Sequence, residues 1–494
     1  MNLTRRKLLT GGAALAAAAA LPPMATAAPE PATLRVVKRS IDVDGRGASV
    51  FGIVQPDGKH GLDIDVTAPF QVRLENQSGE DTLVHWHGLT PPASQDGVPG
   101  LSQPLLAPGA AYDYDFPLQR PGTFWMHSHY GLQEQRLLAA PLIVRDSAGM
   151  PKDEQEIVIM LHDFTFRNPE EIFAELTGGM AMMDHSAMAQ GSRMDMGQGG
   201  MAGMDHSAMG HGAMPSGMGH LNDVEYDAYL ANDRTLDDPE IVTVGPRSKV
   251  LLRFINGSAS TNFWIDLGEL EGSLVAVDGS PCRRSEIDGE GKVLRGRRFP
   301  LAMSQRIDVA VPIQTAGAFP ILALREGDMA QTGIILATPG AAITRVPIKA
   351  ADLAPPVDLG LERAIAAVHP IARAADRRLT LDLTGAMMGY VWGLNGLIYG
   401  AHRPLTVTRG QRVEIEMVNR TDMSHPMHLH GHTFQVVEID GQRIDGPMRD
   451  TVLVPVSGRV AIAFDADNPG RWAFHCHNLY HMAAGMMTTL EYET

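Results

Sequence analysis

The chain has few cysteines: only Cys282 and Cys476 occur among its 494 residues. Proteins exported to oxidising compartments normally pair their cysteines in disulfides. Cys476 stands between two histidines, however, and a cysteine that binds a metal is not available for a disulfide. Cys282 would then remain a single thiol, which we expect to be a small buried hydrophobic residue. The sequence therefore predicts no disulfide.

Positive charge and long apolar runs are also scarce. The formal net charge is −16, and residues 1–28 carry basic residues but no acid, so their removal leaves the chain still more negative. Such a surface repels nucleic acid, and we expect no nucleic-acid partner. No stretch approaches the ~20 apolar residues of a membrane span, so we expect none in the mature chain.

Residues 1–28 have the pattern of an export signal. Arg5 and Arg6 precede an alanine-rich apolar run over 11–21, and a small-residue cleavage site ends at Ala27. The paired arginines indicate the twin-arginine route, which carries folded proteins, and hence a periplasmic location. A general secretory signal or an uncleaved anchor is the alternative interpretation.

The length and the residue pattern predict three β domains. At roughly 150 residues per domain, a chain of 494 residues suggests about three. Short β-branched and aromatic runs between Gly, Pro, Asn and Asp are typical of strands, and helical periodicity is scarce. Three of these runs, over 71–76, 250–256 and 412–419, end in Asn before a polar turn. They look like copies of one repeated unit.

A second repeat fixes the register of these copies. Gly122, Gly317 and Gly470 each lead into an apolar strand. Counted from the two repeats, the first and third copies carry histidine pairs at matching places: His85 and His87, His127 and His129, His428 and His430, and His475 and His477. The middle copy has apolar residues there. We therefore expect a metal face on the first and third domains only.

The spacing of the His-x-His pairs suits neighbouring metals. Side chains at i and i+2 of a strand share a face about 6.6 Å apart, far enough to serve two ions. The residue between them faces the other way, so Cys476 is expected to point into its own domain. Random placement of 19 histidines predicts about 0.7 such pairs, and five occur. The fifth ends at His432, which has no counterpart in the first domain and is interpreted as structural.

Four motifs resemble those of the multicopper oxidases, a family that includes laccases and bacterial copper efflux oxidases. The motifs are His85-Trp86-His87-Gly88, His127-Ser128-His129, His425-Pro426-Met427-His428-Leu429-His430-Gly431, and His475-Cys476-His477 followed by His481 and Met486. The resemblance covers about residues 35–494. It implies an all-β fold of three cupredoxin-like Greek-key β-sandwich domains, which we place at 33–150, 155–345 and 360–494.

The resemblance also implies four copper ions. Type 1 copper would be held by His425, Cys476 and His481, with Met486 as the axial ligand. The three-copper cluster would take His85 and His428 for type 2 copper, His87, His127 and His477 for one type 3 ion, and His129, His430 and His475 for the other. If each histidine is replaced by its counterpart in the other repeat, one type 3 set becomes the other. This predicts that a pseudo-two-fold axis relates the two sets. Met482 and Met487 compete for the axial place, although the step from His481 favours Met486.

The implied reaction removes single electrons from a reducing substrate at type 1 copper and reduces dioxygen to water at the cluster. Cys476 is expected to carry the electrons, because both of its sequence neighbours would bind type 3 ions. Asp96 resembles an acid that supplies protons to the cluster in family members, and a simple Asp-Gly turn is the alternative. His60, His162 and His369 are isolated and are interpreted as ordinary core or surface residues.

A methionine-rich insertion at 180–220 lies in the expected second domain. Residues 180–218 include eleven methionines, and a Met-Asp-His-Ser sequence begins at Met183 and again at Met204. The segment lacks aromatic residues, so it is expected to be mobile. Thioethers favour Cu(I), and such repeats resemble those of copper-resistance oxidases. Copper efflux oxidases carry their insertion in the third domain, so delivery of substrate, copper binding alone and no function all remain open here.

Together these features predict a monomeric periplasmic copper oxidase that oxidises Cu(I) to Cu(II) with dioxygen, in copper tolerance. Asp422 and Met423, just before His425, occupy places where similar enzymes bind substrate Cu(I), and a solvated turn is the alternative. A laccase that oxidises a small aromatic reductant is the nearest alternative function. A copper-sequestering protein with secondary oxidase activity is another.

Overall fold

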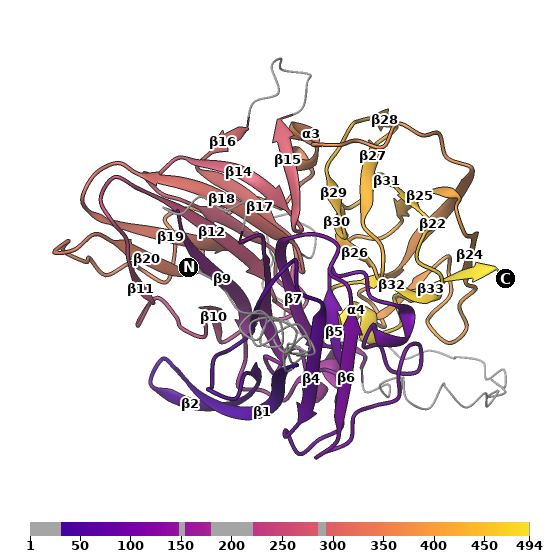
Figure 1. Cartoon of the computed structure of the whole chain (residues 1–494), viewed down its shortest axis with the longest axis horizontal. Helices are drawn as coiled ribbons and strands as arrows, with labels where there is room; N and C mark the ends of the chain where they lie inside the picture. The colour runs from indigo at the N-terminus through magenta and orange to yellow at the C-terminus, as the bar shows by residue number, and fades with distance from the viewer. Residues whose placement is uncertain (1–30, 148–153, 179–220, 285–292, 494) are drawn as a thin grey trace, which may run out of the picture. The chain divides into compact units, whose positions relative to one another are not determined.

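The structure is a computed structural model that describes residues 31–147, 154–178, 221–284 and 293–493. The expected export signal and the methionine-rich insertion lie outside these residues. Within them, strands dominate and form three successive pairs of sheets along the chain, which Figure 1 separates by colour from indigo to yellow. The predicted fold class is confirmed: the chain is all-β, with three cupredoxin-like sandwiches.

The first sandwich pairs the sheet β2-β1-β4-β6 with the sheet β3-β8-β7-β5. Its elements are β1 (Ala32–Val43), β2 (Arg46–Val54), β3 (Leu62–Asp65), β4 (Phe70–Asn76), β5 (Val84–His87), the 3-10 helix η1 (Ala93–Gln95), β6 (Ala111–Phe116), β7 (Gly122–Ser128) and β8 (Ala139–Arg145). Buried and more exposed residues alternate along β4, as in a strand with one face on a core. In that core Trp86 packs against Phe70 and Tyr114, at ring-centroid distances of 4.9 and 4.8 Å.

The second sandwich pairs the sheet β10-β9-β12-β18-β14-β15-β21, on which β16 also pairs with β14, with the sheet β11-β20-β19-β13-β17. Its elements are β9 (Glu154–Phe164), α2 (Pro169–Leu176), β10 (Ala228–Ala231), β11 (Ile241–Thr243), β12 (Ser248–Asn256), β13 (Phe263–Asp266), β14 (Gly272–Val277), β15 (Ser280–Arg284), β16 (Leu294–Gly296), β17 (Arg298–Leu301), β18 (Arg306–Ile313), β19 (Ala318–Arg325), β20 (Gln331–Ala337), α3 (Gly360–Ala364) and β21 (Ile365–Ala367).

The third sandwich pairs the sheet β23-β22-β25-β31-β27-β28, on which β29 also pairs with β27, with the sheet β24-β33-β32-β26-β30. Its elements are β22 (Arg377–Ala386), β23 (Val391–Leu394), β24 (Leu405–Thr408), β25 (Arg412–Asn419), β26 (His425–Leu429), β27 (Phe434–Ile439), β28 (Gln442–Arg443), β29 (Met448–Arg449), β30 (Thr451–Val454), β31 (Arg459–Asp465), β32 (Arg471–Cys476), α4 (Leu479–Ala483) and β33 (Met487–Glu493). Its core contains Cys476 and Trp392.

The repeated asparagine forms the same type of hydrogen bonds in all three sandwiches. Asn76, Asn256 and Asn419 end β4, β12 and β25, and each side-chain oxygen accepts the backbone N–H two residues further on, at 3.0, 3.1 and 2.9 Å. Each amide nitrogen donates to carbonyl oxygens of the loop and of a neighbouring strand. A buried amide that satisfies several backbone groups fixes a turn, which explains why the residue recurs.

We propose that the three pairs of sheets correspond to the three predicted domains. Helix α3 and strand β21 follow residue 360, where the third domain was expected to begin, but β21 pairs with β15 of the second sandwich. The third pair of sheets begins with β22 at Arg377.

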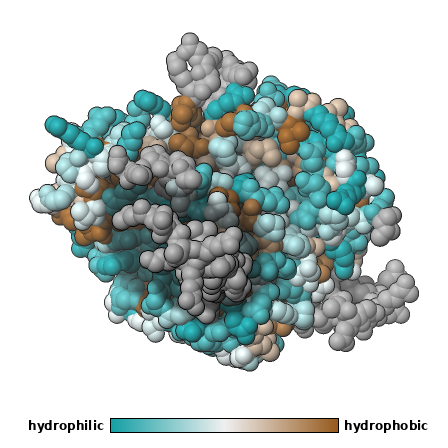
Figure 2. All heavy atoms as spheres, viewed as in Figure 1, coloured by the Kyte–Doolittle hydropathy of each residue, from teal (hydrophilic) through white to brown (hydrophobic). Residues whose placement is uncertain are grey.

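On the face in Figure 2, hydrophilic residues cover most of the visible surface, and hydrophobic ones form small separate patches. Among the described helices, none has the length and apolar character of a membrane span.

Candidate metal centres

Antiparallel strand pairing places the four predicted histidine pairs in two matching ladders. In the first sandwich β5 pairs with β7, and His85 lies opposite His127. In the third sandwich β26 pairs with β32, and His428 lies opposite His475. These two ladders are repeat mates, so the register inferred from the sequence repeats is confirmed.

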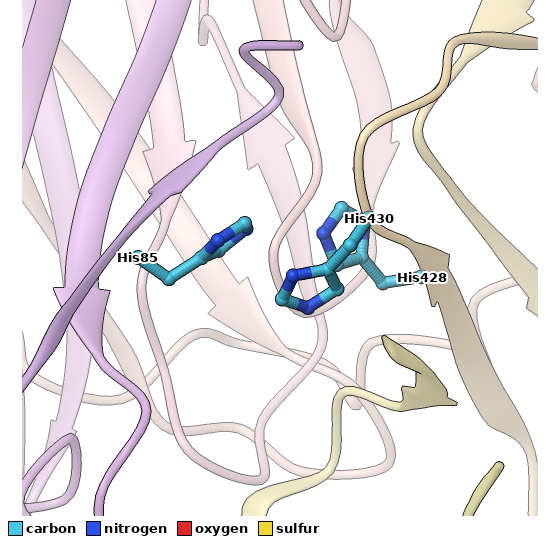
Figure 3. Close-up of side chains that lie close together, drawn as sticks. All are labelled: His85, His428 and His430. Atoms are coloured by element: carbon cyan, nitrogen blue, oxygen red, sulfur yellow. The ribbon is translucent and has the colours of Figure 1, made fainter. Parts of the chain in front are cut away.

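The two ladders face each other, and their imidazoles meet between them. Figure 3 shows His85 on one side and His428 and His430 on the other, with the rings directed toward one another. The ring centroids of His85 and His430 are 3.8 Å apart, and those of His87 and His428 are also 3.8 Å apart. Exchange of repeat mates turns the first of these pairs into the second. The equal distances therefore fit the pseudo-two-fold axis that the sequence predicts.

Members of each predicted type 3 set lie near one another. The Nε2 atom of His475 lies 3.0 Å from that of His430 and 3.4 Å from that of His129. In the other set, the ring of His477 lies 5.1 Å from that of His87 and 5.0 Å from that of His127. The predicted type 2 pair, His85 and His428, has its ring centroids 5.7 Å apart.

Several of these histidines have a ring nitrogen available for a metal. Five buried ring nitrogens in the group have no hydrogen-bond partner in the described structure: Nε2 of His85, His127, His428 and His477, and Nδ1 of His87. The opposite nitrogens of His85, His127, His428 and His475 each lie within 3.0 Å of a backbone carbonyl oxygen, which can accept their proton. Because unpaired buried polar atoms are costly, this arrangement fits imidazole ligands of copper.

Burial also keeps the imidazoles neutral. Desolvation lowers the pKa of His87, His428 and His430 well below the usual value, and neighbouring histidines add to the effect. Desolvation by burial also lowers the pKa of His475, to about 3. The neutral ring is the form that binds a metal, so the cluster is prepared for coordination at neutral pH.

A second group lies inside the third sandwich and matches the predicted type 1 set. The Nδ1 atoms of His425 and His481 are 3.1 Å apart, and Sγ of Cys476 lies 3.6 and 3.8 Å from them. All three residues are buried. Trp392 packs against His481, with ring centroids 4.1 Å apart. One thiolate sulfur and two imidazole nitrogens that converge in an apolar core are the donors of a blue copper site.

The methionines that compete for the axial place lie in different surroundings. Met486 is fully buried in the core cluster that contains Cys476. Its backbone is fixed by hydrogen bonds from Met486 N–H to the carbonyl of His481 and from Cys476 N–H to the carbonyl of Met486, each 3.0 Å. Met482 belongs to the same core cluster, but both Met482 and Met487 line a small cavity beside His129. This placement supports Met486 as the axial residue.

The outer nitrogens of the type 1 histidines contact two residues that the sequence did not single out. Thr421 Oγ1 lies 2.7 Å from Nε2 of His425. Asp223 Oδ1 lies 3.2 Å from Nε2 of His481, and the side chain of Asp223 is shielded from solvent. Thr421 belongs to the polar turn after the repeated Asn419, whereas Asp223 belongs to no repeat or motif. The sequence signal for Asp223 was only its position just after the methionine-rich insertion.

The structure places Asp422 and Met423 in different surroundings, and their contact with substrate Cu(I) stays a prediction. Asp422 is exposed and lines a surface depression with Ser457 and Arg459. Met423 is buried in the core of the third sandwich. The turn at Asn419 instead directs Thr421 toward the type 1 histidine.

Asp96 lies at the cluster and also forms the predicted Asp-Gly turn, while its role in proton supply stays a prediction. Its backbone follows η1, and its carbonyl oxygen is 2.8 Å from Nδ1 of His85. Its carboxylate Oδ2 is 2.9 Å from Nδ1 of His430. Gly97, with φ of +83°, has no room for a side chain, because a Cβ would collide with the carbonyl oxygen of Val84. The Asp-Gly turn thus delivers the acid to the two histidines.

Two further acids contact the cluster histidines. Oε2 of Glu134 lies 2.8 Å from Nδ1 of His127, and Oε1 lies 3.8 Å from Nδ1 of His477. Oδ1 of Asp450 lies 3.1 Å from Nε2 of His87. Both acids come from loops outside the repeats, so counting from repeat positions did not reach them.

Three further histidines lie outside the two candidate metal centres. His432 uses both ring nitrogens within the protein, facing the carbonyl of His430 at 2.9 Å and the hydroxyl of Tyr492 at 2.6 Å, which supports its structural interpretation. His369 is exposed. His162 is a core residue, as one interpretation allowed, but neither of its ring nitrogens has a partner in the described structure. Cys282 and Cys476 are both buried free thiols.

Comparison with known proteins agrees with this geometry. Residues 61–149 and 373–494 each match a family model described as multicopper oxidase. The chain is 32% identical over 428 residues to multicopper oxidase MmcO of Mycobacterium tuberculosis, a match that covers 85% of this chain and 79% of that protein. The chain belongs to the multicopper oxidase family. It is therefore an oxidoreductase of a family that binds copper and uses dioxygen and a reducing substrate.

Other relatives of this multicopper oxidase carry more specific names. It is 27% identical to copper resistance protein A of Escherichia coli, over 85% of this chain and 86% of that protein. Its fold is similar to the crystal structure of a multi-copper oxidase from Pseudomonas thermotolerans, with a TM-score of 0.66, 23% identity, and coverage of 93% of this chain and 98% of that chain.

Proposed function

We propose that this multicopper oxidase oxidises Cu(I) to Cu(II) in copper tolerance, as a periplasmic monomer exported by the twin-arginine route. The proposed ligands are those predicted: a type 1 set in the third sandwich, and eight histidines that hold one type 2 and two type 3 ions between the first and third. When bound, these coppers take single electrons from the substrate and pass them to dioxygen. The chain's own residues position the substrate, the ligands and the protons.

The observation that carries the proposal is the position of Asp223. Its carboxylate touches the type 1 residue His481, and it follows the methionine-rich insertion by three residues. Helix α2 precedes the insertion, and the ring of its Phe173 lies 6.5 Å from that of Tyr390, which lies 5.9 Å from that of His481. Both flanks of the insertion thus lie beside the type 1 site, although the insertion belongs to the second sandwich in sequence. This supports delivery of Cu(I) from its thioethers to that site.

The chemistry of the two groups suits a hand-over of a cuprous ion. Thioethers bind Cu(I) without charge, and a carboxylate attracts the cation and prefers the harder Cu(II) product. The contact with His481 holds the pKa of Asp223 below its usual value, against the effect of burial, so the carboxylate is charged at neutral pH. An electron that enters at His481 is next to Cys476, whose neighbours His475 and His477 belong to the two type 3 sets.

The test compares oxygen uptake with Cu(I) as substrate in three proteins: the intact protein, Asp223→Asn, and a deletion of residues 180–218. We expect the deletion to raise the KM for Cu(I), and Asp223→Asn to lower turnover at least tenfold. Asp422→Asn is the matched control and should leave both constants unchanged. The type 1 spectrum and potential are recorded for each variant, so that damage to the copper site is separated from loss of substrate binding. Unchanged Cu(I) kinetics in both variants would refute the proposal.

A laccase function has one observation in its favour, because the Asp223 carboxylate is also able to accept the proton of a phenol. Oxygen uptake with a dimethoxyphenol distinguishes the two substrates. If the phenol is turned over faster than Cu(I), and the deletion of 180–218 leaves this unchanged, the laccase alternative is correct. Copper binding without oxygen uptake with either substrate would indicate sequestration instead. Light scattering and cell fractionation test the monomer and the periplasmic location.

A further inference from the structure

Asp450 is the pseudo-two-fold counterpart of Asp96. The backbone carbonyl of Asp96 lies 2.8 Å from Nδ1 of His85, and the backbone carbonyl of Asp450 lies 2.8 Å from Nδ1 of His428. His85 and His428 are repeat mates in the first and third sandwiches. The two aspartates therefore hold equivalent histidines by equivalent bonds, although Asp96 follows its histidine by 11 residues and Asp450 follows by 22.

The carboxylates of the two aspartates each cross to the opposite sandwich and face repeat mates there, although at different ring nitrogens. Asp96 Oδ2 lies 2.9 Å from Nδ1 of His430 in the third sandwich. Asp450 Oδ1 lies 3.1 Å from Nε2 of His87 in the first. His430 and His87 are again repeat mates. Each aspartate thus ties a type 2 histidine of its own sandwich to a type 3 histidine of the other.

The symmetry breaks at Arg306, which begins β18 in the second sandwich. Its Nη1 donates to Asp450 Oδ1 at 2.7 Å, and its Nη2 donates to Asp450 Oδ2 at 2.5 Å. Its Nε donates to the carbonyl of Thr123 in β7 of the first sandwich at 3.2 Å. One fully buried guanidinium therefore connects all three sandwiches. Among the described residues, Asp96 has no ion pair with an Arg or Lys.

The glycine of the first histidine motif is needed where this ion pair passes the chain. Gly88 has φ of +88°, which favours glycine. A Cβ on it would lie 2.5 Å from Nη2 of Arg306 and 2.7 Å from Oδ2 of Asp450. Glycine is therefore needed at position 88 because the ion pair between Arg306 of the second sandwich and Asp450 leaves no room for a side chain there.

The ion pair also decides which nitrogen His87 offers to a metal. Both oxygens of Asp450 accept hydrogen bonds from Arg306, so the carboxylate faces Nε2 of His87 as an acceptor, and Nε2 carries the proton. The lone pair is then on Nδ1, which is buried and without a partner in the described structure. The ring is held further by stacking on His428, at a centroid distance of 3.8 Å and an interplanar angle of 17°.

We propose that Arg306 is a positioning residue of the cluster, which acts through Asp450 to fix the orientation and tautomer of His87. The second sandwich, which supplies none of the predicted copper ligands, thereby has a direct part in building the copper site. The inference rests on the proposed ligand assignment but not on the identity of the substrate. Loss of a residue that hydrogen-bonds to a metal ligand typically weakens metal binding 10- to 100-fold. We expect a loss of copper affinity of this size when Arg306 is replaced.

The test measures copper loading of Arg306→Met, with Arg449→Met as the matched control. Arg449 is also fully buried at this junction, but it pairs with Asp278 at 3.2 Å and Glu362 at 2.7 Å rather than with a residue that contacts a cluster histidine. The readouts are copper per chain, the type 2 electron paramagnetic resonance signal, and the blue type 1 absorption. We expect Arg306→Met to keep the blue absorption, bind the cluster coppers at least tenfold more weakly and change the type 2 signal. Arg449→Met should keep all three readouts.

Two results would overturn the proposal. One is a wild-type cluster in Arg306→Met. The other is an equal loss of cluster copper in both variants with an equal fall in Tm, which would show a structural role only. If Arg306→Met does not fold, the double variant Arg306→Met/Asp450→Asn replaces the ion pair by neutral groups of similar size. An intact cluster in that variant would equally refute the role. If the wild-type protein binds no cluster copper, the ligand assignment itself fails, which is a different outcome.

Discussion

Replacement of Glu134 by Leu is expected to weaken copper binding without weakening the fold. The acid is buried, and its Oε2 lies 2.8 Å from Nδ1 of His127. The substitution places an apolar side chain of similar size there, and it removes this acceptor and leaves His127 Nδ1 only the carbonyl of Ser128, at 3.0 Å. A 10- to 100-fold loss of affinity at one type 3 ion corresponds to about 1.4–2.7 kcal/mol of binding free energy.

The stability of the metal-free protein should move in the opposite direction. Burial, with a contribution from Asp163, holds the pKa of Glu134 well above its usual range, which means that burying its charge costs folding free energy at neutral pH. We therefore expect the Tm of metal-free Glu134→Leu to be equal to or above that of the wild type. Glu134→Gln keeps an oxygen acceptor and should recover part of the copper affinity.

The assay is copper titration of the metal-free protein, followed by the near-ultraviolet absorption of the type 3 pair and by Tm. Glu362→Gln is the matched control, because Glu362 is equally buried but pairs with Arg449 rather than with a histidine. Copper affinity within twofold of the wild type in Glu134→Leu would refute the reasoning. A fall in Tm together with a fall in affinity would assign Glu134 to the fold instead.

Three further predictions concern other parts of the chain. Met486→Leu should keep the blue colour and raise the type 1 reduction potential, measured by spectroelectrochemistry, whereas Met487→Leu should not change it. Burial lowers the pKa of His162 to about 4, so the neutral folded form contributes stability that is present above about pH 6.5 and is lost as the pH falls toward 4. His162→Phe should therefore flatten the fall in Tm between pH 7 and 4.5, and an unchanged profile would contradict this. Asn419→Ala leaves the N–H of Thr421 without its buried acceptor, at a cost of about 1–3 kcal/mol, and should lower Tm and shift the type 1 spectrum.

The sequence predicted the features that arise from periodicity and repetition. Strands alternate their side chains, so the His-x-His spacing was enough to place each pair on one face and to point Cys476 into the core. The repeated Asn and Gly then fixed which histidines are mates, and the matching ring distances of 3.8 Å follow from that register. Features that recur at a regular interval in the sequence can therefore be predicted without a structure.

The residues behind the ligands could not be predicted in the same way. Asp223, Glu134 and Asp450 come from loops, and their histidine partners lie in other parts of the chain or at no fixed interval. Sequence separation alone does not show which acids contact the histidines: Asp422 is three residues from His425 and exposed, while Asp223 is 258 residues from His481 and in contact with it. Only the packing of three sandwiches brings such groups together.

The division of the cluster histidines between the two ends of the chain has a consequence for maturation. The first sandwich supplies four of them and the third supplies the other four, from His85 to His477. A growing chain therefore offers no complete set of these histidines until His477 has been synthesised and the outer sandwiches have docked. Under the proposed assignment, the cluster coppers are loaded last, onto a finished tertiary structure. A truncated or half-folded molecule then never holds a dioxygen-reactive cluster, and the cell is spared the partly reduced oxygen species that an incomplete site would release.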